Sequence, residues 1–185
     1  IRDIGVTGVQ TCALPIFDQL PREPQKVTAR RMRVVHGGMA ATAASCVARL
    51  GGASEYWGRV GDDDTGHELI AALQATGVHT QVRLVAGGQS PLAAIWVDPH
   101  GERMLAVVTG NLDTDPDWLP LQRLDAADAV QVDFRWVQGA EKILTRAQQR
   151  KLPRVLDADV GSQNALPTLL PLANHVIFSE RGLRK

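Results

Sequence analysis

From His36 to Val78 the chain reads HGGMAATAASCVARLGGASEYWGRVGDDDTGHELIAALQATGV. One glycine pair precedes an alanine-rich segment and a second pair ends it, which predicts a helix over residues 39–50. Residues 55–60 read as a strand, and three aspartates then begin a helix over residues 65–76, because carboxylates cap free N–H groups at a helix start. This stretch therefore predicts two helices around one strand, with backbone N–H groups open to a polar ligand.

The rest of the chain continues the alternation of strands and helices. Further strands are expected at residues 129–132, 154–156 and 175–178, with helices at 139–149 and 166–172. Strands that alternate with helices imply right-handed βαβ units and a parallel sheet, and therefore an α/β fold. Strands near residues 25–35 and 91–108 do not fit this sheet, and the second region reads as a hairpin with the turn Asp98-Pro99-His100-Gly101. We expect these strands to form an accessory sheet, such as a lid over a site.

Bulk composition is that of an ordinary globular domain. The chain has 185 residues, of which 44% are hydrophobic and 22% are charged. Twenty basic residues balance twenty acidic ones, which gives no reason to expect nucleic acid or an anionic membrane as a partner. There is no membrane-length apolar run, and the two cysteines, Cys12 and Cys46, make no disulfide framework. We expect a cytoplasmic protein.

The two ends of the chain differ from its middle. The residues from Val6 to Ile16 resemble the conceptual translation of a common DNA-sequencing adapter, so we predict that residues 1–16 are an artefact outside the fold. The alternative is a genuine, loosely ordered strand. The chain stops at Lys185 directly after a strand-like run, and we expect residues 17–185 to be the N-terminal part of a single domain.

Two glycine-containing motifs have both a structural and a functional interpretation. Gly37-Gly38 would let the backbone approach a bound hydroxyl compound, or would simply form a tight turn from strand to helix. This spacing does not satisfy the dinucleotide-binding pattern G-x-G-x-x-G. The acidic turn from Gly61 to Gly66 is too short for a calcium loop, and it predicts a turn with a helix cap.

Charged residues follow three successive predicted strands. The carboxyl ends of parallel strands face the ligand crevice of open α/β sheets. An arginine there, Arg135, could hold an anionic group with two hydrogen bonds, or could be a surface side chain stacked on Trp136. The carboxylates at the next strand ends could face magnesium, phosphate or a sugar hydroxyl, or could cap helices. They are Asp157, Asp159 and Glu180.

These residues resemble the ribokinase-like sugar kinases of the phosphofructokinase B family, and within it the sulfofructose kinases most closely. The resemblance covers about Phe17 to Lys185. It rests on the glycine pair with the alanines after it, the segment from Gly58 to Gly66, Gly77-Val78 and Arg135-Trp136. It implies a three-layer α/β/α fold with a mostly parallel sheet and a small β-lid, the lid often forming a dimer contact. It also implies transfer of a phosphoryl group from ATP, with Mg²⁺, to a sugar hydroxyl.

The resemblance also implies roles for individual residues. Lys26 and Arg135 match positions that bind the sulfonate in sulfofructose kinases. A third such position, asparagine in that group, falls near Val107 here, so 6-deoxy-6-sulfofructose, a phosphorylated ketose and a plain ketose all remain open. The residues implied to line the sugar pocket are Gly37, Gly38 and Thr42.

Two family features have no counterpart in the residues taken as genuine. The Gly-Ala-Gly-Asp segment that supplies the general-base aspartate would lie beyond Lys185, and the N-terminal aspartate that holds sugar hydroxyls falls in the adapter-like stretch. Because phosphoryl transfer depends on positioning and charge stabilisation, we predict that this chain has no catalytic residue of its own and is inactive. The alternatives are a non-catalytic sugar-binding or dimerisation module, and an oxidoreductase half-domain that binds a nicotinamide cofactor.

Overall fold

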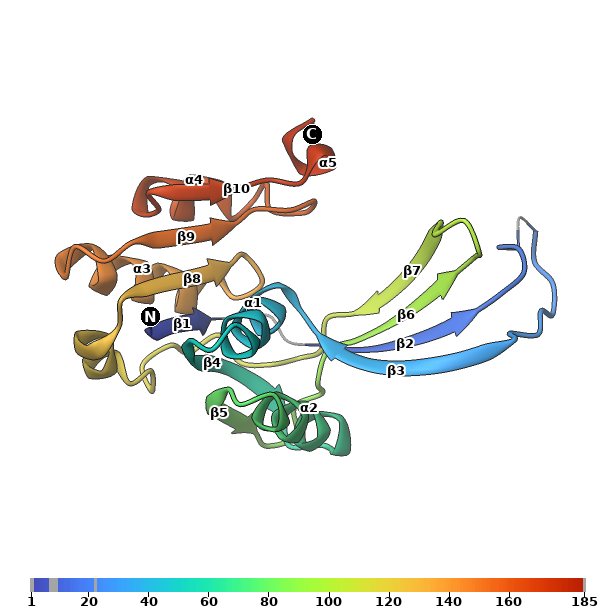
Figure 1. Cartoon of the computed structure of the whole chain (residues 1–185), viewed down its shortest axis with the longest axis horizontal. Helices are drawn as coiled ribbons and strands as arrows, with labels where there is room; N and C mark the ends of the chain where they lie inside the picture. Colours follow the sequence, from blue (N-terminus) through green and yellow to red (C-terminus); the bar gives the residue numbers. More distant parts are fainter. Residues whose placement is uncertain (1, 7–9, 22, 185) are drawn as a thin grey trace.

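The strands of the computed structural model, which describes residues 2–6, 10–21 and 23–184, fall into two separate sheets (Figure 1). The larger sheet has six strands in the order β10-β9-β8-β1-β4-β5, and the smaller has four in the order β3-β2-β6-β7. All pairings in the larger sheet are parallel. The prediction of a parallel main sheet with an accessory sheet beside it is therefore confirmed.

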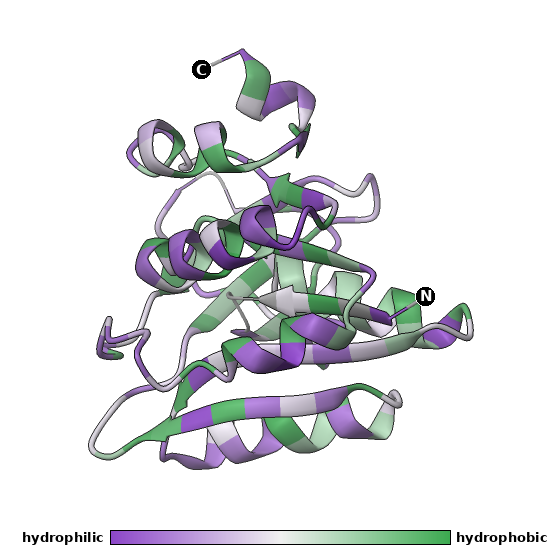
Figure 2. Ribbon diagram, turned by 90° about the vertical axis from the view of Figure 1, so that its left-hand side faces the viewer, coloured by the Kyte–Doolittle hydropathy of each residue, from purple (hydrophilic) through white to green (hydrophobic). Residues whose placement is uncertain are grey.

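The main sheet is built from six short segments of the chain. They are β1 (Arg2–Val6), β4 (Ala53–Gly61), β5 (His79–Val85), β8 (Ala129–Asp133), β9 (Arg154–Asp157) and β10 (His175–Ile177). The helical segments between and after them are α1 (Met39–Arg49), α2 (Asp64–Ala75), η1 (Leu121–Ala126), α3 (Val137–Gln149), α4 (Leu166–Leu169), η2 (Leu170–Leu172) and α5 (Glu180–Leu183). In Figure 2 hydrophilic and hydrophobic residues alternate along the helices, as expected where one helix face packs on a sheet.

Helices cover both faces of the main sheet, which gives the molecule three layers. Successive side chains of a strand point to opposite faces, and the fully buried neighbours Tyr56 and Trp57 of β4 lie in different hydrophobic clusters. The Tyr56 cluster includes alanines of α1 and leucines of α2, and the Trp57 cluster includes buried residues of α3 and α4. The three-layer α/β/α arrangement expected from the sequence is thus present.

The smaller sheet, which we call the lid, projects away from the main sheet (Figure 1). Its strands are β2 (Gln10–Ile16), β3 (Arg31–Gly37), β6 (Leu92–Val97) and β7 (Arg103–Val108). The expected hairpin is present as the antiparallel pair β6–β7. The strand expected near residues 25–35 begins only at Arg31, because its partner β2 ends at Ile16, which pairs with Arg31. The first bond between them is donated by the Arg30 N–H to the Ile16 carbonyl.

Residues 2–6 and 10–16, which the sequence placed in an artefact outside the fold, contribute one strand to each sheet. β1 lies between β8 and β4 in the middle of the main sheet, and its Ile4 is fully buried. β2 lies between β3 and β6 in the lid. The structure therefore includes residues 2–6 and 10–16 in its sheets, and the adapter origin of these residues stays a prediction about the DNA.

Candidate functional site

Helix α1 begins at the carboxyl end of the main sheet, where ligands of such folds bind. Gly38 is the N-cap of α1 and has a φ of 109°, a conformation that favours glycine. Because glycine has no side chain, the N-cap residue makes no side-chain hydrogen bond to the helix start. Thr42 is exposed one turn later, and a Cβ atom placed on Gly37 would lie 3.5 Å from its Oγ1. The three residues expected to line a sugar pocket therefore lie together at an accessible helix start.

Asp133, the last residue of β8, connects this helix start to the next strand end. Its carboxylate is fully buried and accepts hydrogen bonds from the Ala40 N–H at 3.3 Å and from the Arg135 N–H at 2.8 Å. One side chain thereby fixes both the start of α1 and the turn that carries Arg135. The sequence reasoning singled out Arg135 and missed Asp133, although a carboxylate at a strand end was the available signal.

Arg135 is exposed, and its guanidinium lies over the ring of Phe134 at 5.0 Å from the centroid. The expected alternative, stacking on Trp136, is made instead by Arg59, at 4.6 Å from that ring. Arg135 therefore lies at the rim of the site with an aromatic ring behind it.

Two carboxylates, those of Asp157 and Asp159, lie at the end of the next strand, β9. Burial, followed by the charges of Asp133 and Asp159, raises the pKa of Asp157. Hydrogen bonds from the Ser179 hydroxyl and the Val160 N–H, helped by the charge of Arg135, lower the pKa of Asp159. The structure thus brings the ends of β8 and β9 together, and the Asp159–Ser179 bond ties them to the segment after β10.

Among the residues that the structure describes, two predicted site residues form no hydrogen bond or ion pair with Asp133, Arg135, Asp157 or Asp159. Glu180 is exposed in the first turn of α5, where it pairs with Arg184. Lys26 is exposed in the connection between β2 and β3. This connection lies at the outer end of the lid (Figure 1). Within the described residues, no hydrogen bond or ion pair joins Lys26 to the rim of the main sheet.

The carboxylates of the rim do not by themselves form a metal centre. In the described part of the chain, no group of three or more histidine, cysteine, aspartate or glutamate side chains could hold a metal ion. Magnesium usually keeps several water ligands and binds one or two carboxylates together with substrate phosphates. One or two of Asp157, Asp159 and Glu180 would suit that mode of binding, so their role at a magnesium or phosphate rim stays a prediction.

The acidic turn after β4 has the structural role that the sequence predicted. Asp63 is the N-cap of α2, and its Oδ1 accepts a hydrogen bond from the Gly66 N–H at 2.8 Å. Partial burial raises the pKa of the Asp63 carboxyl, but hydrogen bonds from Ser90 and Gly66 outweigh burial and hold it below its usual value. Asp62 points elsewhere and pairs with His67 at 2.9 Å.

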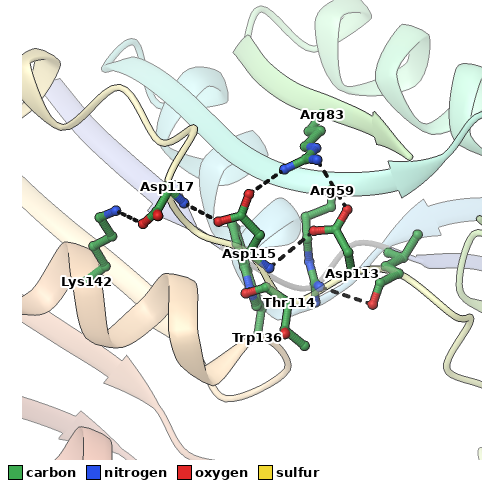
Figure 3. A network of polar contacts seen from close by, with 9 residues as sticks. Arg59, Arg83, Asp113, Thr114, Asp115, Asp117, Trp136 and Lys142 are labelled. Carbon is green, nitrogen blue, oxygen red and sulfur yellow. Dashed lines mark hydrogen bonds and ion pairs between the residues drawn. The ribbon is translucent and has the colours of Figure 1, made fainter. Parts of the chain in front are cut away.

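A chain of polar contacts fixes the segment that returns from the lid to the main sheet (Figure 3). Arg83 of β5 forms ion pairs with Asp113 at 3.6 Å and Asp115 at 3.0 Å. The indole N–H of Trp136 donates to the Thr114 carbonyl at 3.1 Å, and Lys142 pairs with Asp117 at 2.6 Å. The return segment is therefore held against β5 and against both the N-cap and the body of α3. Nothing in the sequence pattern indicated this network, because its partners lie far apart in the chain.

A cavity of about 560 Å³ lies at the opposite, amino end of the main sheet, where His79 begins β5. Arg123 lines it, but the guanidinium is already occupied by the buried Glu55 carboxylate at 2.6 and 2.9 Å. The cavity is thus remote from the helix start that the glycine pair opens, and we place the candidate site at the carboxyl end.

Comparison with known proteins identifies the family. Residues 12–185 match the family model of the pfkB family carbohydrate kinases. The chain belongs to this family. The crystal structure of a candidate ribokinase from Agrobacterium tumefaciens superimposes with a TM-score of 0.91 at 32% identity, over 97% of this chain and 59% of that one.

Two curated relatives of this pfkB-family chain are a ribokinase and a fructokinase. The ribokinase of Bacillus subtilis is 32% identical over 143 residues, which are 75% of this chain and 47% of that protein. Fructokinase-2 of Solanum lycopersicum is 38% identical over 68 residues, which are 36% of this chain and 21% of that protein. The matched part thus spans about half the length of the Bacillus ribokinase. The expected sugar-kinase family and its fold are confirmed.

Proposed function

We propose that the protein to which this chain belongs transfers a phosphoryl group from ATP to a hydroxyl of a ketose or ketose derivative. Family membership supports a sugar kinase, and the observation that carries the proposal is the start of α1. There Gly37 and Gly38 leave backbone partly exposed at the carboxyl end of a parallel sheet, next to a separate lid. A sugar hydroxyl can approach such a backbone closely, and the lid can cover it.

The rim favours a sugar that carries an anionic group. Arg135 is exposed beside the helix start, and a guanidinium can bind sulfonate or phosphate with two hydrogen bonds. We propose that Lys26 adds a second positive charge when the lid closes. Val107, exposed on β7, offers no hydrogen bond where sulfofructose kinases carry asparagine, so a phosphorylated ketose competes with 6-deoxy-6-sulfofructose as the substrate.

ATP and Mg²⁺ are the cofactors that this proposal requires. ATP supplies the phosphoryl group, and Mg²⁺ neutralises the charge on its phosphates. The residues proposed to face them are Asp157 and Asp159, with Glu180 at the edge of the rim. The 185 residues contain no Gly-Ala-Gly-Asp segment. We therefore propose that this chain alone binds the sugar without turnover, which is also the behaviour expected of a non-catalytic binding module.

The lid supports a further proposal about partners. Apolar side chains are exposed on β3 and β7, and they would be covered if two lids met in a homodimer. They are Met32, Val34, Met104, Leu105, Val107 and Val108. Sedimentation of the chain tests this arrangement, because a concentration-independent monomer would contradict it.

Composition supports the remaining proposals about partners and place. The net charge of zero favours a small sugar over nucleic acid or an anionic membrane as the partner. Cys12 and Cys46 are both free thiols, which suits a reducing cytoplasm. Separately, none of the helices in the described part of the chain has the length and apolar character that a bilayer crossing needs.

Calorimetric titration tests the proposed substrate. We expect 6-deoxy-6-sulfofructose or fructose 6-phosphate to bind more tightly than fructose. Replacing Arg135 by alanine should weaken binding of the anionic sugar by about tenfold to one hundredfold, since a hydrogen bond to a charged group contributes about 1.5–3 kcal/mol. Binding of the neutral sugar should change little.

Arg49→Ala is the matched control, because Arg49 is exposed at the far end of α1. Equal losses for charged and neutral sugars would remove Arg135 from the anion site. A coupled assay of ADP release tests the proposal that this chain alone binds the sugar without turnover. Turnover by the 185 residues would contradict that proposal. Binding of a nicotinamide cofactor with no sugar bound would contradict the whole proposal.

A further inference from the structure

The lid is attached to the main sheet at a point that the proposed function does not use. The chain passes from β5 into the lid through residues 86–91, and it leaves the lid through residues 109–120. Ser90 lies in the first passage, two residues before β6, and is only 2% exposed. Its surroundings show how the root of the lid is held.

Asp63 holds Ser90 with both of its carboxylate oxygens, one of which, Oδ1, also caps α2. The Ser90 N–H donates to Asp63 Oδ2 at 2.8 Å, and the Ser90 hydroxyl donates to Oδ1 at 2.6 Å. The hydroxyl oxygen in turn accepts the Gly61 N–H at 2.9 Å, at the end of β4. Capping α2 requires only the bond from Gly66, so the bonds to Ser90 serve the lid passage alone.

Strand β2 and the return passage from the lid meet at the same place. The Pro91 carbonyl accepts the Thr11 N–H of β2 at 3.2 Å. Asn111, in the return passage, accepts the Gln89 N–H through its Oδ1. The entry to the lid, its exit and the start of β2 are therefore linked around Ser90 and its two neighbours in the chain.

Close packing at two glycines allows this arrangement. A Cβ atom at Gly61 would collide with the carbonyl of Gly88 in the entry passage. A Cβ atom at Gly66 would collide with the Gly61 carbonyl and lie 2.8 Å from Ser90 Oγ. The turn between β4 and α2 thus lies directly against the root of the lid, where a carboxylate can reach it.

We propose that Asp63 is a positioning residue that, through Ser90, fixes the root of the lid to the turn between β4 and α2. Hydrogen bonds to a carboxylate are about twice as strong as neutral ones, so this attachment is firmer than the neutral contacts around it. The lid then moves as a unit about a fixed root. This attachment goes beyond the proposed function, because it holds whether or not a sugar is phosphorylated.

Hydrogen exchange of the sugar-free chain, measured peptide by peptide, tests the proposal. Asp63→Ser keeps an N-cap side chain for α2 but lacks the second oxygen, and Ser90→Ala leaves Asp63 free to cap α2. Both variants should raise exchange in the lid strands of residues 92–108 by about tenfold, the factor that corresponds to about 1.4 kcal/mol. Exchange in α2 and in β8 should stay close to that of the unchanged chain.

Asp62→Ser is the matched control, since this neighbouring carboxylate contacts only His67 among the partners described for it. It should leave lid exchange unchanged. Faster exchange in α2 without any change in the lid would show that Asp63 is only a helix cap. An equal rise throughout the main sheet would show general destabilisation. Either result overturns the proposal, and Ser90→Ala alone decides it if Asp63→Ser does not fold. Failure of sugar binding would leave the result standing.

Discussion

Removal of the Asp133 carboxylate should release the start of α1, and the size of the effect follows from its contacts. The buried carboxylate accepts the Ala40 and Arg135 N–H groups, at 3.3 and 2.8 Å. Alanine would leave both donors without this acceptor, at a cost of about 1–3 kcal/mol for each buried donor. Because the Arg135 donor is only partly buried and can be hydrated, we expect Asp133→Ala to lower the free energy of unfolding by about 3 kcal/mol. Asparagine keeps one acceptor oxygen, so Asp133→Asn should cost about half as much.

Urea unfolding followed by tryptophan fluorescence measures these differences, provided that the slope of the transition stays constant. Asp62→Ala is the control, because Asp62 is exposed and its change should stay within about 0.5 kcal/mol. If Asp133→Ala were no more destabilising than this control, Asp133 would not cap α1. The account of how the helix start and Arg135 are held together would then be wrong.

Two further predictions concern the carboxylates outside the site. Glu55→Gln should lower the free energy of unfolding, measured in urea, by about 2–3 kcal/mol, because it removes the buried charge that holds Arg123. The control Glu141→Gln, at an exposed position, should change the free energy of unfolding by less than about 0.5 kcal/mol. Equal effects of the two substitutions would contradict the role of Glu55. Since hydrogen bonds hold the pKa of Asp63 low, its contribution to stability should persist at neutral pH and be lost as the pH falls below about 4. The difference in urea midpoint between the unchanged chain and Asp63→Asn should therefore narrow in acid, and a constant difference would contradict the assignment.

Local signals explain which parts of the fold the sequence predicted. The helices after Gly38 and after Asp63 begin where glycine and aspartate place them, because both residues act within one turn of the chain. The hairpin of β6 and β7 was likewise predicted from its turn residues, Asp98 to Gly101, which lie between the two strands. By contrast, no such local signal marks β1 and β2, and the resemblance of residues 6–16 to a translated adapter argued against strands there.

Distance along the chain explains what was missed at the site. Asp133 acts on Ala40, which lies 93 positions earlier, and Asp63 acts on Ser90, 27 positions later. No periodicity in the sequence reports such pairs.

Amide chemical shifts test the central claim, that a sugar binds at the start of α1, most directly. Titration of the ¹⁵N-labelled chain with 6-deoxy-6-sulfofructose, fructose 6-phosphate and fructose should move the resonances of Gly37, Gly38 and Thr42. The two anionic sugars should also move that of Arg135. Shifts confined to His79 and its neighbours, around the cavity at the amino end of the sheet, would contradict the account, as would the absence of any shift with all three sugars.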